Sequence, residues 1–242
     1  MQTYNKPIIA ISSCLLGNPV RYDGQDKRHS FVLDTLSDLC EWTGICPEVD
    51  AGLGVPRPPV ELVQMLDTVR VVGRDNKKLD VTADLRSAAL RLETQIVSQK
   101  SPAAVCGFIW QSRSPSCGLG STPLRNAGGD IIAHRSGLVA AYIASQFPWL
   151  PMREDTALMS IASCMDFFAE VEWVQRWRQS PDREALWSDE KVFLKWPAAA
   201  KRDLETLLDS PQEVFLTRFL HYWRLHYSAP QPFVWKPDYS SK

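Results

Sequence analysis

Apolar and polar positions alternate along the amino-terminal part of the chain in a way that predicts strands and helices in turn. A buried strand is expected over residues 6–13, an amphipathic helix over 29–42 and a short second strand over 44–47. Residues 68–73 are rich in β-branched side chains, which predicts a strand that pairs with 78–81 as a hairpin.

The alternation of predicted strands and helices continues to about residue 150. A helical face recurs over 82–99, an apolar strand follows over 103–110, and a second helix is expected over 137–147. Residues 49–59 hold two glycines and three prolines, which predicts a fixed loop. Strands that alternate with helices favour an α/β fold, namely a Rossmann-like open, mostly parallel sheet with helices on both faces.

The pattern changes after about residue 155. Residues 162–178, 197–209 and 213–227 predict helices, and six of the nine tryptophans lie in this part of the chain. We therefore predict an α/β domain over 1–155, followed by a small α-helical, tryptophan-rich region over 156–242.

Charge and hydropathy restrict the classes of partner. The chain carries 27 basic and 28 acidic residues, a net charge of -1, so it has no overall basic field of the kind that attracts nucleic acid. The start of the chain lacks the apolar segment of a secretory signal, and no apolar run approaches the roughly 20 residues of a membrane span. A cytoplasmic protein that does not contact membranes is expected.

Three of the six cysteines follow short apolar runs directly. Cys14, Cys46 and Cys117 each stand where a predicted strand has just ended, and the carboxyl ends of parallel strands meet at one edge of a sheet. Three thiolates at one point, without a fourth, are typical of a metal centre that keeps one coordination position open. Disulfides are the alternative, but clustered thiols in a reducing compartment more often bind metal. The remaining cysteines are interpreted as small buried hydrophobes: Cys40, Cys106 and Cys164.

Five short motifs surround these cysteines, and together they resemble the thiouracil desulfidase family over about residues 6–150. The motifs are residues 11–17 (Ile-Ser-Ser-Cys-Leu-Leu-Gly), 20–24 (Val-Arg-Tyr-Asp-Gly), 46–48 (Cys-Pro-Glu), 52–59 (Gly-Leu-Gly-Val-Pro-Arg-Pro-Pro) and 114–118 (Ser-Pro-Ser-Cys-Gly). Their number and order make the resemblance specific.

The resemblance implies a cofactor, a reaction and two catalytic residues. It implies a [4Fe-4S] cluster held by Cys14, Cys46 and Cys117, with one iron free to take the sulfur of the substrate. It implies hydrolysis of a thiolated uracil, such as 2- or 4-thiouracil, to uracil and sulfide. It also implies that Glu48 and Ser114 are catalytic.

Physical chemistry is consistent with these implied roles. A thiocarbonyl is a soft ligand that suits thiolate-bound iron, and a partly desolvated carboxylate beside the cluster can accept and return a proton. Two plainer interpretations stay open. Glu48 would only accept backbone hydrogen bonds from the glycine-rich loop, and Ser114 would only cap the turn before Pro115.

Several polar residues near the motifs are candidates for substrate binding. Arg21, Asp23 and Arg57 stand in rigid loops, where they could contact the uracil edge, a ribose or a phosphate. Structural ion pairing is the alternative, with Asp23 and Arg57 as the expected pair. Ser13 is a candidate backbone partner near the cluster, and Ser116 completes the set.

The nature of the substrate and the role of the tail stay open at this level. Some members of the family carry a second domain and are associated with 4-thiouridine in tRNA, so a thiolated pyrimidine and a thiouridine-containing tRNA are both candidate partners. In the tail, aromatic residues alternate with Arg218 and Arg224, which would suit RNA contact. Its 11 basic and 12 acidic residues over 156–242 argue against it. A non-catalytic metal-binding module with a protein-interaction tail is the rival interpretation.

Overall fold

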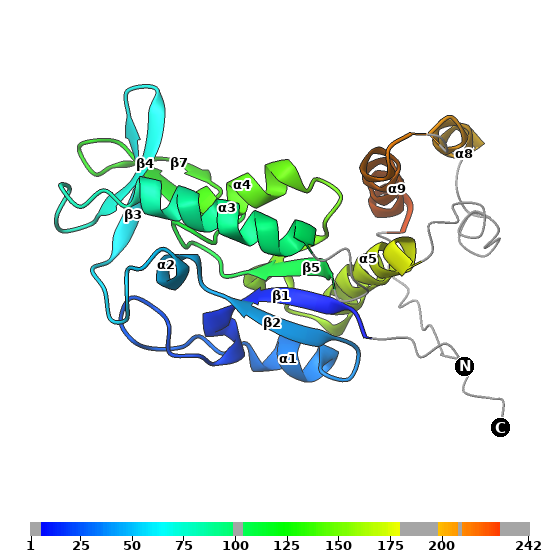
Figure 1. The fold of residues 1–242 in the computed structure, drawn as a ribbon, viewed down its shortest axis with the longest axis horizontal. Helices are drawn as coiled ribbons and strands as arrows, with labels where there is room; N and C mark the ends of the chain where they lie inside the picture. Colours follow the sequence, from blue (N-terminus) through cyan, green and yellow to red (C-terminus); the bar gives the residue numbers. More distant parts are fainter. Residues whose placement is uncertain (1–5, 99–103, 180–197, 208–209, 228–242) are drawn as a thin grey trace.

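The protein contains two four-stranded sheets in a computed structural model that describes residues 6–98, 104–179, 198–207 and 210–227. The first sheet is central, and the second lies at the end of the molecule away from the carboxyl-terminal helices (Figure 1). The first sheet has the order β2-β1-β5-β8, and all of its neighbouring strands are parallel. These strands are Glu41–Ile45 (β2), Ile8–Ser12 (β1), Val105–Trp110 (β5) and Met152–Glu154 (β8). The predicted α/β class with a mostly parallel sheet is confirmed.

The middle of the first sheet is the most deeply buried part of the protein. Every residue of β5 is buried, and Ile9, Ala10 and Ile11 of β1 have no exposed surface. A strand buried on both faces must be apolar along its whole length, which is why both segments read as continuous apolar runs. The two strands end side by side, and this edge carries the cysteine motifs.

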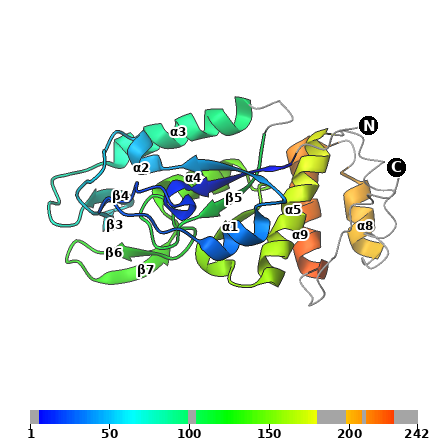
Figure 2. The same ribbon diagram turned by 90° about the horizontal axis from the view of Figure 1, so that it is seen from below.

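Helices cover both faces of this sheet. The helices α3 (Thr82–Ser98) and α4 (Leu138–Gln146) pack side by side on one face, and α1 (Ser30–Leu36) and α5 (Ile161–Gln179) lie together on the other (Figures 1 and 2). The apolar stripe of α3 points inward with Leu85, Ala89 and Ile96 buried. The predicted two-faced arrangement is therefore present.

The second sheet was not predicted. It has the order β4-β3-β6-β7 and consists of two antiparallel hairpins joined by the parallel pair β3 and β6. Its strands are Thr68–Gly73 (β4), Val60–Met65 (β3), Thr122–Arg125 (β6) and Ile131–Arg135 (β7). The predicted pairing of 68–73 with 78–81 is wrong: β4 pairs with β3 along its length, and only a single bridge joins Val72 to Asp80. The tight turn at Leu66 and Asp67 carries no glycine or asparagine, so the usual hairpin signal is missing.

The first predicted helix is shorter than expected. It ends at Leu36, and the chain then enters β2 at Glu41 although the apolar spacing continues through Leu39 and Cys40. Pairing of β2 with β1, from Ile8 opposite Glu41 to Ser12 opposite Ile45, takes Glu41 and Trp42, the last residues of the predicted helix, into the sheet. The predicted loop over 49–59 also begins with the last residues of a helical turn, α2 (Pro47–Asp50).

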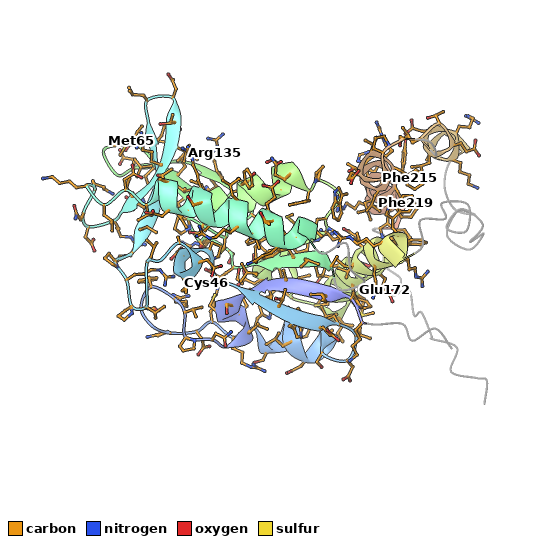
Figure 3. All side chains as sticks on the ribbon, viewed as in Figure 1. Cys46, Met65, Arg135, Glu172, Phe215 and Phe219 are labelled. Atoms are coloured by element: carbon orange, nitrogen blue, oxygen red, sulfur yellow. The ribbon has the colours of Figure 1, made fainter. Side chains whose placement is uncertain are left out.

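The carboxyl-terminal helices pack on the first sheet through α5. Gly107 of β5 makes this possible, because a Cβ there would lie 2.5 Å from Cγ2 of Val171. The helices α8 (Ala198–Glu205) and α9 (Gln212–Tyr227) follow, and Phe215 and Phe219 of α9 face α5 (Figure 3). The ring of Phe215 stacks on Trp177 with centroids 4.7 Å apart.

A buried carboxylate also joins these helices. Glu170 of α5 accepts a hydrogen bond from Arg153 of β8 and one of 2.9 Å from Nη2 of Arg224 on α9. Helix α5 is thus in contact with the α/β domain on one side and with α9 on the other. The predicted boundary after residue 155 stays a prediction. The tryptophans at positions 187, 196 and 235 lie outside the described residues.

No helix in the described part of the chain combines the length and the apolar character that crossing a membrane requires.

Candidate metal and catalytic site

A cavity of about 170 Å³ opens at the carboxyl ends of β1, β2 and β5, and the three motif cysteines line it. Cys14 lies in the short 3-10 turn Ser13–Leu16 that follows β1, Cys46 follows β2 directly, and Cys117 lies in the turn after β5. Parallel pairing brings these ends together although the three residues are far apart in the sequence.

All three thiols are free, and the environment disfavours their ionised forms. Burial, and then the charge of Cys46, raises the pKa of Cys14 to about 11. Burial, and then Glu48 and the two other cysteines, raises the pKa of Cys117 well above its ordinary value. Burial also raises the pKa of Cys46. Three thiolates can coexist here when a positively charged centre compensates them.

The donor set fits an iron-sulfur cluster. Among the described residues, no group of three or more His, Cys, Asp or Glu side chains is gathered around the position of a single metal ion. Thiolates on one tetrahedral zinc would lie only about 3.8 Å apart, given Zn–S bonds of about 2.3 Å. A cluster spreads its thiolates over separate irons, so it accepts cysteines that line a cavity without touching. Neither Cys40, Cys106 nor Cys164 lines this cavity.

Glu48 is held in the cavity wall by two partners. It lies in α2 and is buried, its Oε2 accepts a hydrogen bond of 2.7 Å from Nε of Arg57, and Nη2 of Arg57 lies 2.7 Å from the same oxygen. Its Oε1 accepts a bond of 2.8 Å from the hydroxyl of Ser116. Arg57 in turn donates from Nη1 to the carbonyls of Val20 and Gly54, at 2.9 Å each. The carboxylate is therefore fixed and charge-compensated beside the thiols.

These contacts correct one of the sequence-based expectations. The predicted ion pair of Asp23 with Arg57 is not formed, because Arg57 pairs with Glu48 and Asp23 pairs with Arg21 at 3.4 Å. Ser116 has no exposed surface and lies outside the cavity lining, where its hydroxyl holds Glu48, and the roles of Ser116 and Asp23 in substrate binding stay predictions. Asp23 also lies outside the lining, where it orients Arg21.

Ser114 lines the cavity and also organises the turn that carries Cys117. Its Oγ accepts bonds from the backbone N–H of Ser116, at 3.3 Å, and of Cys117, at 3.1 Å. The side-chain oxygen of Ser114 therefore caps the turn before Cys117, as the plainer interpretation predicted. The hydroxyl hydrogen has no recorded acceptor in the described part of the chain, so it is free to be donated into the cavity. Ser13 also lines the cavity, and its Oγ accepts a bond from Asn18.

Arginines surround the cavity, and the sequence analysis identified only some of them. Arg74 and Arg113 join Arg21 in the lining, and Glu48 is the one acidic residue among the described lining residues. Neither new arginine has an ion-pair partner within the described ranges. Arg74 follows β4 of the second sheet, and Arg113 follows β5 of the first. The two arginines come together only because both sheets end at this cavity.

A half-buried ion pair between Lys27 and Asp155 joins two of the loops beside the cavity. Asp155, directly after β8, accepts a bond of 2.9 Å from Nζ of Lys27 and one of 2.8 Å from the backbone N–H of Ser112. The N–H of Lys27 donates to the carbonyl of Cys14, and Ser112 lines the cavity. Burial alone would raise the pKa of Asp155, but the bonds from Lys27 and Ser112 outweigh burial and lower it.

Comparison with known proteins agrees with this geometry. A sequence model of the family described as 2-thiouracil desulfurase matches residues 9–155. A solved structure described as the [4Fe-4S]-dependent thiouracil desulfidase TudS is 33% identical, with a TM-score of 0.50, over 63% of this chain and 93% of that chain. No curated protein matches the chain. Because the family match covers more than half of the 242 residues, the chain belongs to the 2-thiouracil desulfurase family.

Proposed function

We propose that this protein is a [4Fe-4S]-dependent desulfidase that converts a thiolated uracil to uracil and sulfide. The observation that carries the proposal is the shared cavity, in which the three free cysteines lie beside a fixed carboxylate and a serine hydroxyl. Family membership and the likeness to TudS support the same reaction.

Cys14, Cys46 and Cys117 would hold the cluster, one thiolate on each of three irons. When bound, the cluster supplies a soft Lewis-acidic iron without a protein ligand, which suits the sulfur of a thiocarbonyl and draws electron density from the neighbouring carbon. The turn that begins at Ser114 and the helix α2 keep Ser114 and Glu48 at the wall of the same cavity.

Glu48 would act on the attacking water. Arg57 and Ser116 hold its carboxylate in one orientation, and Oε1, which accepts one bond from Ser116, keeps a lone pair that these two donors leave unused. A carboxylate so placed can accept the proton of water as the oxygen attacks the ring carbon, and can return it to the ring. Ser114 would donate its hydroxyl hydrogen to the substrate or to that water.

Two exposed arginines in the lining favour a substrate that carries a phosphate. Arg74 and Arg113 give the cavity a positive charge although the chain as a whole has a net charge of -1, whereas the charge of Arg21 is offset by Asp23. A thiolated uridine nucleotide fits this charge better than the free base. 4-Thiouridine in tRNA is the second candidate substrate for the same reason. The tail gives RNA less support, because Arg218 lies 3.5 Å from Asp203 and Arg224 pairs with Glu170.

The test begins with anaerobic reconstitution of the full chain with iron and sulfide. We expect visible iron-sulfur absorption and about four irons per chain. Cys14→Ser, Cys46→Ser and Cys117→Ser should each lower the amount of bound iron. Cys40→Ser should retain the iron, because Cys40 is buried away from the cavity, where its thiol donates to the carbonyl of Leu36.

Turnover separates the enzyme from a metal-binding module. Sulfide release is measured from 2-thiouracil, 4-thiouracil, 4-thiouridine, its monophosphate and thiolated tRNA. Glu48→Gln should keep the cluster and lose about 10²–10⁴-fold in rate. A reconstituted protein that releases no sulfide from any of these substrates, or a Glu48→Gln variant with undiminished rate, would refute the proposed function.

A further inference from the structure

A second, larger cavity lies on the face of the molecule formed by α3 and α4. It has a volume of about 890 Å³ and is bounded by these two helices and by the strands of the second sheet. Pockets that bind small molecules usually measure about 300–1,000 Å³. It shares no lining residue with the cysteine cavity, so it is a distinct feature of the fold.

One side of this α3–α4 cavity is apolar. Leu62 of β3 and Val69 of β4 form part of its wall, and Leu90 of α3 and Leu138 of α4 line it from the helices. Leu90 is 53% exposed, which leaves a large apolar side chain open to solvent at the cavity. Such a surface favours a ligand with an aromatic or aliphatic body.

The polar side chains of the cavity are cationic or neutral. Arg86 of α3 and Arg135 at the end of β7 line it together with His134, and no carboxylate is among its described lining residues. Neither arginine has an ion-pair partner in the described ranges. The neighbouring carboxylate of Glu93 is already engaged, because it accepts the hydroxyl of Tyr142. Figure 3 places Arg135 well away from Phe215 and Phe219 of the carboxyl-terminal helices.

The wall of the cavity is held by backbone hydrogen bonds. Between β7 and α4, the N–H of Gly137 donates to the carbonyl of Gly118 at 2.7 Å, and that of Leu138 donates to Pro115 at 2.9 Å. A Cβ on Gly137 would lie 2.6 Å from the backbone carbon of Ser116, so the two segments are in close contact. These contacts fix the start of α4, and with it Leu138, at the edge of the cavity.

We propose that the α3–α4 cavity is a second ligand site that binds a small organic anion with an apolar or aromatic body. The anionic group would contact Arg86 and Arg135, and the body would lie against Leu62, Leu90 and Leu138. Charge complementarity carries this assignment, since the lining offers two guanidinium groups and no opposing carboxylate.

The probe is 8-anilinonaphthalene-1-sulfonate, an aromatic sulfonate whose fluorescence rises in an apolar site. We expect saturable binding to the full, folded chain with one site per molecule. Arg86→Glu and Arg135→Glu should each weaken binding at least about tenfold, because each reverses a charge that contacts the anion. Arg202→Glu, the same change on the exposed face of α8, should leave binding unchanged.

Three results would overturn the proposal. The first is the absence of saturable binding, as expected if another segment of the chain fills the cavity. The second is equal binding by both cavity variants and Arg202→Glu. The third is loss of binding in Arg113→Glu, with the cavity variants unaffected, which would assign the probe to the cysteine cavity. Arg86→Lys, which retains the charge, should retain binding if the loss in Arg86→Glu is electrostatic, and unfolding curves establish that each variant is folded.

Discussion

Replacing Arg57 by methionine should destabilise the protein strongly, because it leaves the carboxylate of Glu48 buried without a counter-charge. The side chains of Arg57 and Glu48 are only 4% and 11% exposed, and two guanidinium nitrogens lie 2.7 Å from the same oxygen. Removing one partner of a buried ion pair typically costs about 3–5 kcal/mol. In a chain of this length each kcal/mol lowers the melting temperature by about 2–4 °C, so the expected decrease is roughly 6–20 °C.

The assay is thermal unfolding of the full chain followed by circular dichroism, with and without reconstituted iron. Arg70→Met is the matched control, because Arg70 pairs with Asp80 at the surface and its side chain is 50% exposed. An exposed pair contributes about 0–1 kcal/mol, so this control should melt close to the wild type.

A second substitution identifies the cause. In Arg57→Met combined with Glu48→Gln, the uncompensated charge is absent. The double variant should therefore lose about 0.5–3 kcal/mol less stability than the sum of the losses in the two single variants. The ion-pair argument would be refuted if Arg57→Met melted at the same temperature as Arg70→Met. It would also be refuted if the stability losses of Arg57→Met and Glu48→Gln were simply additive.

Three further predictions concern the parts of the molecule around this pair. Gly107→Ala places a methyl group 2.5 Å from Val171, so it should cost about 1–3 kcal/mol in urea unfolding; an unchanged midpoint would show that α5 does not pack on β5. Asp155→Asn should cost about 1.5–3 kcal/mol at pH 7 by urea unfolding, because Lys27 and Ser112 lose a charged acceptor. Since the pKa of Asp155 lies below its unfolded value of about 3.9, its contribution is complete well above that pH and is lost as the pH falls through the folded pKa. A difference from the wild type that did not shrink as the pH was lowered below about 3.9 would contradict this. Air exposure of the reconstituted protein should bleach its visible absorption within one preparation, because an iron without a protein thiolate is open to oxidants; stable absorption in air would argue against an open iron.

Strand and helix positions were predictable where a segment has a single role. The apolar run of β5 and the helical spacing of α3 identify these elements within two residues of their ends, because both are buried by their own periodic pattern. The prediction failed where the local pattern and the tertiary pairing disagree. Helical spacing continues through Cys40, yet the helix ends at Leu36, and Glu41 and Trp42 pair with β1 as part of β2.

The second sheet shows the same limit. Val60–Met65 follows a proline-rich loop and has no glycine turn before Thr68, so nothing local marks it as a hairpin. Its parallel pairing with β6, which begins at Thr122, depends on residues more than fifty positions away. Such pairing is decided by the packing of the whole chain.

The sequence by itself determined which side chains are candidates for the chemistry, since each cysteine motif follows its own strand signal and the motifs carry a family resemblance. Only the tertiary structure decided how those side chains are held: Glu48 with Arg57 and Ser116, Arg21 with Asp23, and two additional arginines at the cavity mouth. The physical reason is that an apolar run or a turn is a local property of the chain. A salt bridge instead goes to whichever partner the fold brings within about 4 Å, and several carboxylates and guanidinium groups compete for that place.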